Sequence, residues 1–89
     1  MIQSTLTISN RLGLHARASA KLTKLAGSFA SDVHLARNGR RVNAKSIMGV
    51  MMLAAGPGSE VAVEIDGPDE EQAFASIKAL VENRFGESE

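Results

Sequence analysis

Cysteine, tryptophan and tyrosine are absent from the sequence, and phenylalanine occurs only three times in 89 residues. Without cysteine the chain can form neither a disulfide nor a thiolate metal site, which fits a reducing compartment. The sequence also has no apolar stretch near the roughly 20 residues that a membrane-spanning helix needs. No charged segment followed by an apolar run indicates a signal peptide. We therefore expect a soluble, cytoplasmic protein that does not insert into a membrane.

An excess of charge of either sign is missing as well, because ten basic residues balance ten acidic ones. Zero net charge argues against an electrostatic attraction to nucleic acid. Arg37, Arg40 and Arg41 form a local basic cluster, but no aromatic side chain that could stack on a base lies near it. Two histidines on separate elements offer no metal-ligand spacing. We expect no nucleic-acid partner, no metal and no cofactor.

The length and the alternation of apolar residues predict a small domain with β-structure. A chain of 89 residues suffices for one domain, so we expect residues 1–89 to form a single domain. The alternating stretches are a predicted strand over 2–9, a hairpin over 32–43 and a strand over 61–66. Asn38-Gly39 is a strong turn signal for the hairpin, because both turn positions need positive φ. This turn would place Leu35 opposite Val42.

Apolar residues at helical spacing predict three helices between these strands. They are expected from Ala16 to Gly27, over 46–54 with Ser46 as N-cap, and from Asp69 to Gly86 with Phe85 on the buried face. Asp69 and Gln72 have the spacing of a capping box, and residues 87–89 are expected to fray. The order β-α-β-β-α-β-α predicts a two-layer α/β sandwich, with helices covering one side of an antiparallel sheet.

His15 stands where a glycine-containing loop meets the first predicted helix. A helix N-terminus has unpaired N–H groups and a partial positive charge, which together suit a phosphate. A neutral imidazole there is a good nucleophile, and Arg17 adds a guanidinium. A histidine near a helix start is also often a capping or surface residue, and the residues alone favour that interpretation. His34 is expected to face solvent from a strand.

The stretch Gly13-Leu14-His15-Ala16-Arg17, followed by Ala18-Ser19-Ala20-Lys21-Leu22, resembles the active-site signature of the HPr family. HPr proteins are the histidine-containing phosphocarriers of the bacterial phosphoenolpyruvate:sugar phosphotransferase system. Asn43-Ala44-Lys45-Ser46-Ile47-Met48-Gly49-Val50-Met51 resembles the family's second signature, around a regulatory serine. The length and the element order are similar too. The resemblance implies an α+β open-faced sandwich with sheet order 1-4-2-3 and three helices on one face.

The resemblance also implies what the first signature does. His15 would accept a phosphoryl group on Nδ1 from phosphorylated Enzyme I and pass it to an EIIA-type domain, as a stoichiometric carrier and not as an enzyme. Ala16, Arg17 and Ala18 would bind the phosphate. The family most often has proline where this chain has Ala18. Alanine maintains the helix and adds an N–H group, so we expect the chemistry to persist. The change bears on the branch that the chain serves, either sugar transport or a nitrogen-branch (NPr-type) regulatory carrier acting mainly by protein binding.

Ser46 has two interpretations that the sequence leaves open. As an N-cap it would contribute about 1 kcal/mol to stability. The resemblance implies instead a regulatory site, because HPr kinase/phosphorylase phosphorylates the matching serine in some lineages. A phosphate there would add about −1.5 to −2 charges and repel an acidic partner.

Partner docking is expected on the second helix. Helical spacing cannot bury Met48, Met51 and Met52 together, so we expect Met48 and Met51 to form an exposed apolar patch beside His15. Methionine suits surfaces that fit several partners. The basic residues that would surround this patch are Arg11, Arg17, Lys21, Lys24 and Lys45. A single, transiently exposed site suits a monomer.

Overall fold

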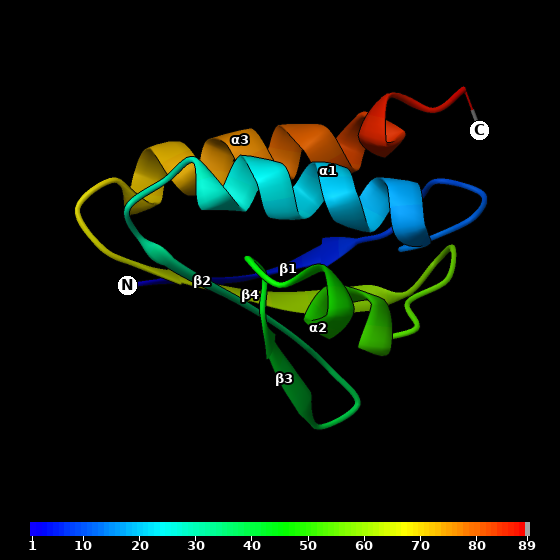
Figure 1. Ribbon diagram of the computed structural model, residues 1–89, viewed down its shortest axis with the longest axis horizontal. Coiled ribbons are helices and arrows are strands. Elements are labelled where there is room, and N and C mark those ends of the chain that lie inside the picture. Colours follow the sequence, from blue (N-terminus) through cyan, green and yellow to red (C-terminus); the bar gives the residue numbers. More distant parts are fainter. Residues whose placement is uncertain (89) are drawn as a thin grey trace.

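Four strands form one antiparallel sheet in the order β1-β4-β2-β3 in the computed structural model, which describes residues 1–88. The strands are β1 (Ile2–Thr7), β2 (Asp32–Arg37), β3 (Arg40–Asn43) and β4 (Glu60–Asp66). The helices are α1 (Ala16–Gly27), α2 (Ile47–Met52) and α3 (Glu70–Glu82), followed by a short 3-10 turn η1 (Arg84–Gly86). Figure 1 shows α1 and α3 side by side over the sheet, with α2 next to the β2–β3 hairpin. The open-faced sandwich and its strand order are thus confirmed.

The hairpin has the turn that its sequence predicts. Asn38 and Gly39 have φ values of 53° and 79°, so both turn positions are left-handed. Leu35 pairs with Val42 across the two strands, as expected from this turn. Because side chains alternate across a strand, this register directs Leu35 toward the helices and His34 toward the uncovered face.

The core lies between the sheet and the helices. On β4, Val61, Val63 and Ile65 are buried while the residues between them are more exposed, which is the alternation that the sequence predicts. The helices contribute the apolar residues on their inner faces, which are Ala18, Leu22, Ala26, Val50, Ala73, Ile77 and Val81. None of the helices in residues 1–88 combines the length and the apolar character that crossing a membrane requires.

The last helix is shorter than predicted. It ends at Glu82 and not at Gly86, because Arg84, Phe85 and Gly86 have φ values of 55°, 57° and 77°. The left-handed region is unfavourable for arginine and phenylalanine. Two contacts offset this, since Phe85 is fully buried and its carbonyl accepts a hydrogen bond from Lys21 Nζ at 2.6 Å. The turn sends the following residues back toward the start of α1.

The expected fraying of residues 87–89 is therefore wrong for Glu87, whose side chain hydrogen-bonds to Asn10 and His15. Glu89 lies outside the described residues. The sequence gives little warning of this, since a buried Phe85 fits a continuing helix as well as a turn. The burial of that one side chain fixes where the chain reverses.

The capping box predicted at Asp69 is also wrong. Asp69 precedes α3, but its carboxylate accepts hydrogen bonds from the N–H groups of Ala30 and Ser31, both at 2.9 Å, and from the Ser31 hydroxyl at 2.5 Å. The serine hydroxyl is the main reason that the pKa of Asp69 is below its ordinary value. Glu70 instead accepts the Gly67 N–H at 3.1 Å. Asp69 thus joins the segment after α1 to the start of α3, a contact between distant residues that no local pattern encodes.

Candidate functional site

The loop before α1 is held against the segment that follows α2. Gly13 has a φ of 64°, and a Cβ at this position would collide with the Ala55 carbonyl. The next residue, Leu14, donates its N–H to that same carbonyl at 2.8 Å. Asn10, which is fully buried, donates from Nδ2 to the Gly13 carbonyl at 2.8 Å. These contacts require glycine at position 13 and fix the backbone that leads into His15.

His15 is the N-cap residue of α1, but its side chain does not cap the helix. Its backbone is extended, with φ −76° and ψ −178°, and within residues 1–88 the imidazole makes no hydrogen bond to the N–H groups of the helix. The helical hydrogen-bond ladder begins with Ser19 N–H donating to the His15 carbonyl at 2.8 Å. The N–H groups of Ala16, Arg17 and Ala18 precede that ladder and lie at the positive end of the helix dipole. The arrangement suits an anion beside the imidazole.

The imidazole contacts a residue from the other end of the sequence. His15 Nε2 lies 2.6 Å from Glu87 Oε2, and Asn10 Nδ2 donates to Glu87 Oε1 at 3.1 Å. Hydrogen bonds from Asn10 first, and then from His15, lower the pKa of the Glu87 carboxyl from its ordinary value. The His15 side chain is 25% exposed, so the ring remains accessible from the surface. Sequence reasoning missed Glu87, because its only signal is an acidic residue just past the end of the last helix.

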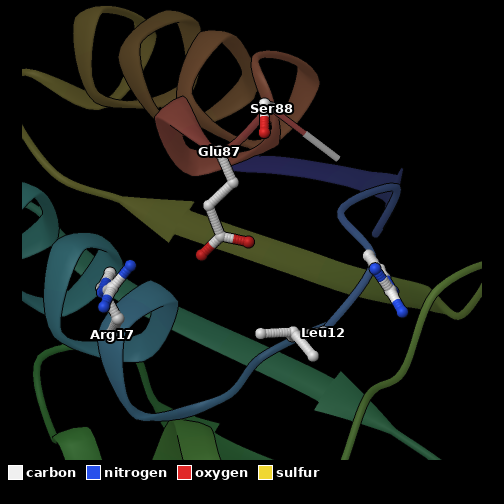
Figure 2. Close-up of a pocket in the computed structure, with 5 residues that line it drawn as sticks. Leu12, Arg17, Glu87 and Ser88 are labelled. Carbon is white, nitrogen blue, oxygen red and sulfur yellow. The ribbon is translucent and has the colours of Figure 1, made fainter.

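A surface pocket of about 260 Å³ lies beside this contact. Its lining residues are Arg11, Leu12, Arg17, Glu87 and Ser88. Figure 2 shows the Glu87 side chain extending from the C-terminal segment toward the first turn of α1, where Arg17 lies. Arg17 is exposed. The pocket therefore lies at the start of α1, and both the predicted Arg17 and the Glu87 carboxylate line it.

Ser46 is the N-cap of α2, as predicted. Its Oγ accepts the Gly49 N–H at 3.2 Å, and the residue is exposed. The opposite end of α2 receives two guanidinium groups, because Arg37 donates to the Leu53 carbonyl at 3.1 Å and Arg40 to the Met52 carbonyl at 3.4 Å. These two arginines of the basic hairpin cluster therefore stabilise the C-terminal end of α2.

Methionines dominate the outer surface of α2. Met48 is 71% exposed, Met52 56% and Met51 39%, and Ile47 adds 43% beside them. We call these four residues the α2 patch. Of the helix residues only Val50 is buried, so α2 contributes little to the core and presents an apolar surface next to α1. Such a cluster is typical of a contact surface for other proteins.

The lysines proposed to surround this patch differ in their surroundings. Lys21 Nζ is bonded to the Phe85 carbonyl, as described above, and Lys45 Nζ donates to the Phe29 carbonyl at 2.9 Å. Lys24 is exposed. His34 is half-buried on the uncovered face of β2, opposite Glu64 of β4. The structure thus brings His15, Arg17 and the α1 N-terminus together and leaves His34 apart from them.

A family model, curated proteins and solved structures all match nearly the whole chain. The family model described as the PTS HPr component phosphorylation site matches residues 2–83. The phosphocarrier protein HPr of Cupriavidus necator is 66% identical over 89 residues, which is 100% of both chains. A crystal structure of HPr from Thermoanaerobacter tengcongensis matches with a TM-score of 0.96 at 39% identity and covers 100% of each chain. An HPr dimer from the same organism matches with a TM-score of 0.79 at 40% identity and covers 98% of this chain and 100% of that one.

Proposed function

This chain belongs to the HPr family of phosphocarrier proteins of the phosphotransferase system, and from that premise we propose that His15 accepts a phosphoryl group from phosphorylated Enzyme I. An EIIA-type domain then takes the group from His15. The observation that carries the proposal is the imidazole at the N-terminus of α1, where it makes no capping bond within residues 1–88. A protein of this kind stores one phosphoryl group and hands it on, without converting a small molecule itself.

The first turn of α1 binds the phosphate in this proposal. The N–H groups of Ala16, Arg17 and Ala18 act as donors, and the Arg17 guanidinium neutralises charge from the pocket side. Phosphoryl transfer depends mostly on positioning and on charge neutralisation. Ala18 in place of proline supplies one more N–H donor, so this substitution leaves the chemistry intact.

The α2 patch is the proposed docking surface for both partners. Met48 and Met51 are exposed, and α2 packs beside α1, whose N-cap is His15. Lys24, Lys21 and Lys45 would add positive charge at its rim. Enzyme I and the EIIA-type domain must reach the same histidine in turn, and flexible methionine side chains can adapt to two different surfaces.

Phosphorylation of Ser46 by HPr kinase/phosphorylase is the proposed regulation. The serine is exposed at the start of α2 and precedes the patch directly. A phosphate would place about −1.5 to −2 charges there, which weakens docking of an acidic partner. Regulation would then act on partner affinity and leave the chemistry of His15 unchanged.

The test is phosphorylation with purified Enzyme I and phosphoenolpyruvate, followed by intact-mass spectrometry. We expect the wild-type protein to gain one acid-labile phosphoryl group. The His15→Ala variant should gain none, and the matched Ser46→Ala variant should gain one as the wild type does. The absence of any gain with a donor that phosphorylates another HPr would contradict the proposal. Parallel reactions with sugar-type and nitrogen-type Enzyme I assign the branch by the faster rate. Sedimentation of the same samples tests the expected monomer against the dimeric relative.

A further inference from the structure

We propose that Glu87 is a positioning residue that holds His15 in the tautomer with the proton on Nε2, which leaves Nδ1 as the nucleophile. The observation behind this is the 2.6 Å contact between His15 Nε2 and Glu87 Oε2. Glu87 lies outside residues 2–83, the part of the chain that the family model matches. The inference rests on the proposed function for its consequence, but the tautomer itself is a property of the unphosphorylated protein.

The identity of the proton donor follows from the chemistry of the two groups. An ionised carboxylate can only accept hydrogen bonds, and Glu87 is kept ionised because its pKa is lowered. The donor in the contact must therefore be the imidazole, with its proton on Nε2. A neutral imidazole carries only one ring proton. Nδ1 is then left with a free lone pair, which a phosphoryl acceptor needs.

A reversal of the chain and three contacts hold the Glu87 carboxylate at the His15 ring. The left-handed residues Arg84, Phe85 and Gly86 reverse the chain after α3. The buried Phe85 ring and the hydrogen bond from Lys21 Nζ to the Phe85 carbonyl fix that reversal. Asn10 then donates to Glu87 Oε1 at 3.1 Å, so both carboxylate oxygens are engaged. A side chain with both oxygens bonded has few alternative positions, and the ring it contacts is fixed in orientation as well.

The same contact compensates charge during the transfer. The Nδ1 lone pair forms a bond to phosphorus while the bond from phosphorus to the donor's atom breaks, and that atom keeps the electron pair. The imidazole of His15 acquires positive charge in this step and retains its Nε2 proton. The carboxylate of Glu87 faces that proton, so the charge develops beside an existing negative group. Transfer to the acceptor reverses the step and restores the same tautomer.

Nitrogen-15 NMR of the unphosphorylated protein tests the tautomer directly, at a pH where the ring is neutral. In the wild type we expect the proton on Nε2 and a ring N–H signal protected from exchange with water. Glu87→Gln keeps the shape of the side chain but can donate as well as accept, and Glu87→Ala removes the contact. Glu87→Ala should lose the protected signal, whereas Glu87→Gln retains a neutral acceptor and should only weaken the protection. Glu82→Gln, an exposed glutamate at the end of α3, is the matched control and should retain it.

Phosphoryl acceptance provides the second measurement. Loss of the partner that orients a metal-bound histidine costs about ten- to a hundredfold. For this partly exposed pair without a metal we expect the lower end, about a tenfold lower kcat of Enzyme I with both Glu87 variants, and an unchanged KM of Enzyme I for its phosphoryl acceptor. A proton on Nδ1 in the wild type, or a protected Nε2 signal that persists in Glu87→Ala, would overturn the inference. So would a Glu87→Ala rate equal to that of Glu82→Gln. If no Enzyme I phosphorylates the wild type, the proposed function fails, and the NMR result alone decides the tautomer.

Discussion

Helices α1 and α2 are each preceded by a polar N-cap residue, but the two N-cap side chains act in opposite ways. At α2 the Ser46 side chain accepts the Gly49 N–H, so the residue stabilises its own helix. At α1 the His15 side chain turns away from the helix and contacts Glu87. The α1 end therefore keeps its N–H groups available for a ligand, and its stability comes from the loop before it. The side chain at the N-cap therefore decides whether a helix start is capped from within, as at Ser46, or left uncapped, as at His15.

The largest expected effect comes from breaking the loop that supports the α1 end. Gly13→Ala introduces a Cβ at a φ of 64°, against the Ala55 carbonyl. Strain of this kind, with the displaced backbone, should lower the free energy of unfolding by about 2–3 kcal/mol. Urea denaturation measures it. Gly27→Ala is the control, because nothing lies within 4 Å of a Cβ there, and it should be neutral or slightly stabilising. Equal stability of the two variants would show that the loop is not rigid.

A smaller effect is expected when the two N-cap side chains are removed. Ser46→Ala should reduce the free energy of unfolding by about 1 kcal/mol, because it leaves the Gly49 N–H without its acceptor. His15→Ala should not show a capping loss, since its ring caps nothing within residues 1–88. Thermal and urea unfolding of both variants measure the difference. Because His15→Ala also removes the contact with Glu87, Glu87→Ala is the control, and a loss in His15→Ala beyond that of Glu87→Ala would mean that the histidine also stabilises its helix.

The smallest expected effect is a dependence of stability on pH through Glu87. Its pKa is lowered in the folded protein, mainly by the hydrogen bond from Asn10. Its contribution to stability is therefore present above the pKa of the unfolded chain and is lost as the pH falls through the folded value. Asn10→Ala should raise the pKa of Glu87 toward its ordinary value. Carbon-13 NMR titration of the carboxyl measures the shift, and an unchanged midpoint would show that Asn10 is not the main cause of the lowered pKa.

Local patterns in the sequence were sufficient for the parts of the fold that depend on neighbouring residues. The Asn38-Gly39 turn, the Leu35–Val42 pairing and the Ser46 cap were all predicted, since each follows from the conformation of a few adjacent residues. His15 and Arg17 stood out for the same reason, because they share one helix start. The resemblance to HPr added the strand order, which no local spacing contains.

The errors share a physical cause, which is contact between distant residues. Asp69 has the right spacing to cap its own helix, but two backbone N–H groups and a hydroxyl from the segment after α1 bind its carboxylate instead. Glu87 reads as part of a polar tail, and its role at the ring depends on how the buried Phe85 turns the chain. Such contacts exist only once the layers have packed, so spacing along the chain cannot reveal them.

The left-handed turn at Arg84, Phe85 and Gly86 limits how the site can be transplanted. Residues 13–22, grafted onto another scaffold, would carry over the helix start, the imidazole and Arg17. They would not carry over the carboxylate, which comes from a residue 72 positions away. A designer who copied only the signature would obtain the proposed phosphate-binding helix start without the carboxylate that contacts the imidazole. Transferring the complete site requires a scaffold that also returns a second segment to the start of the helix.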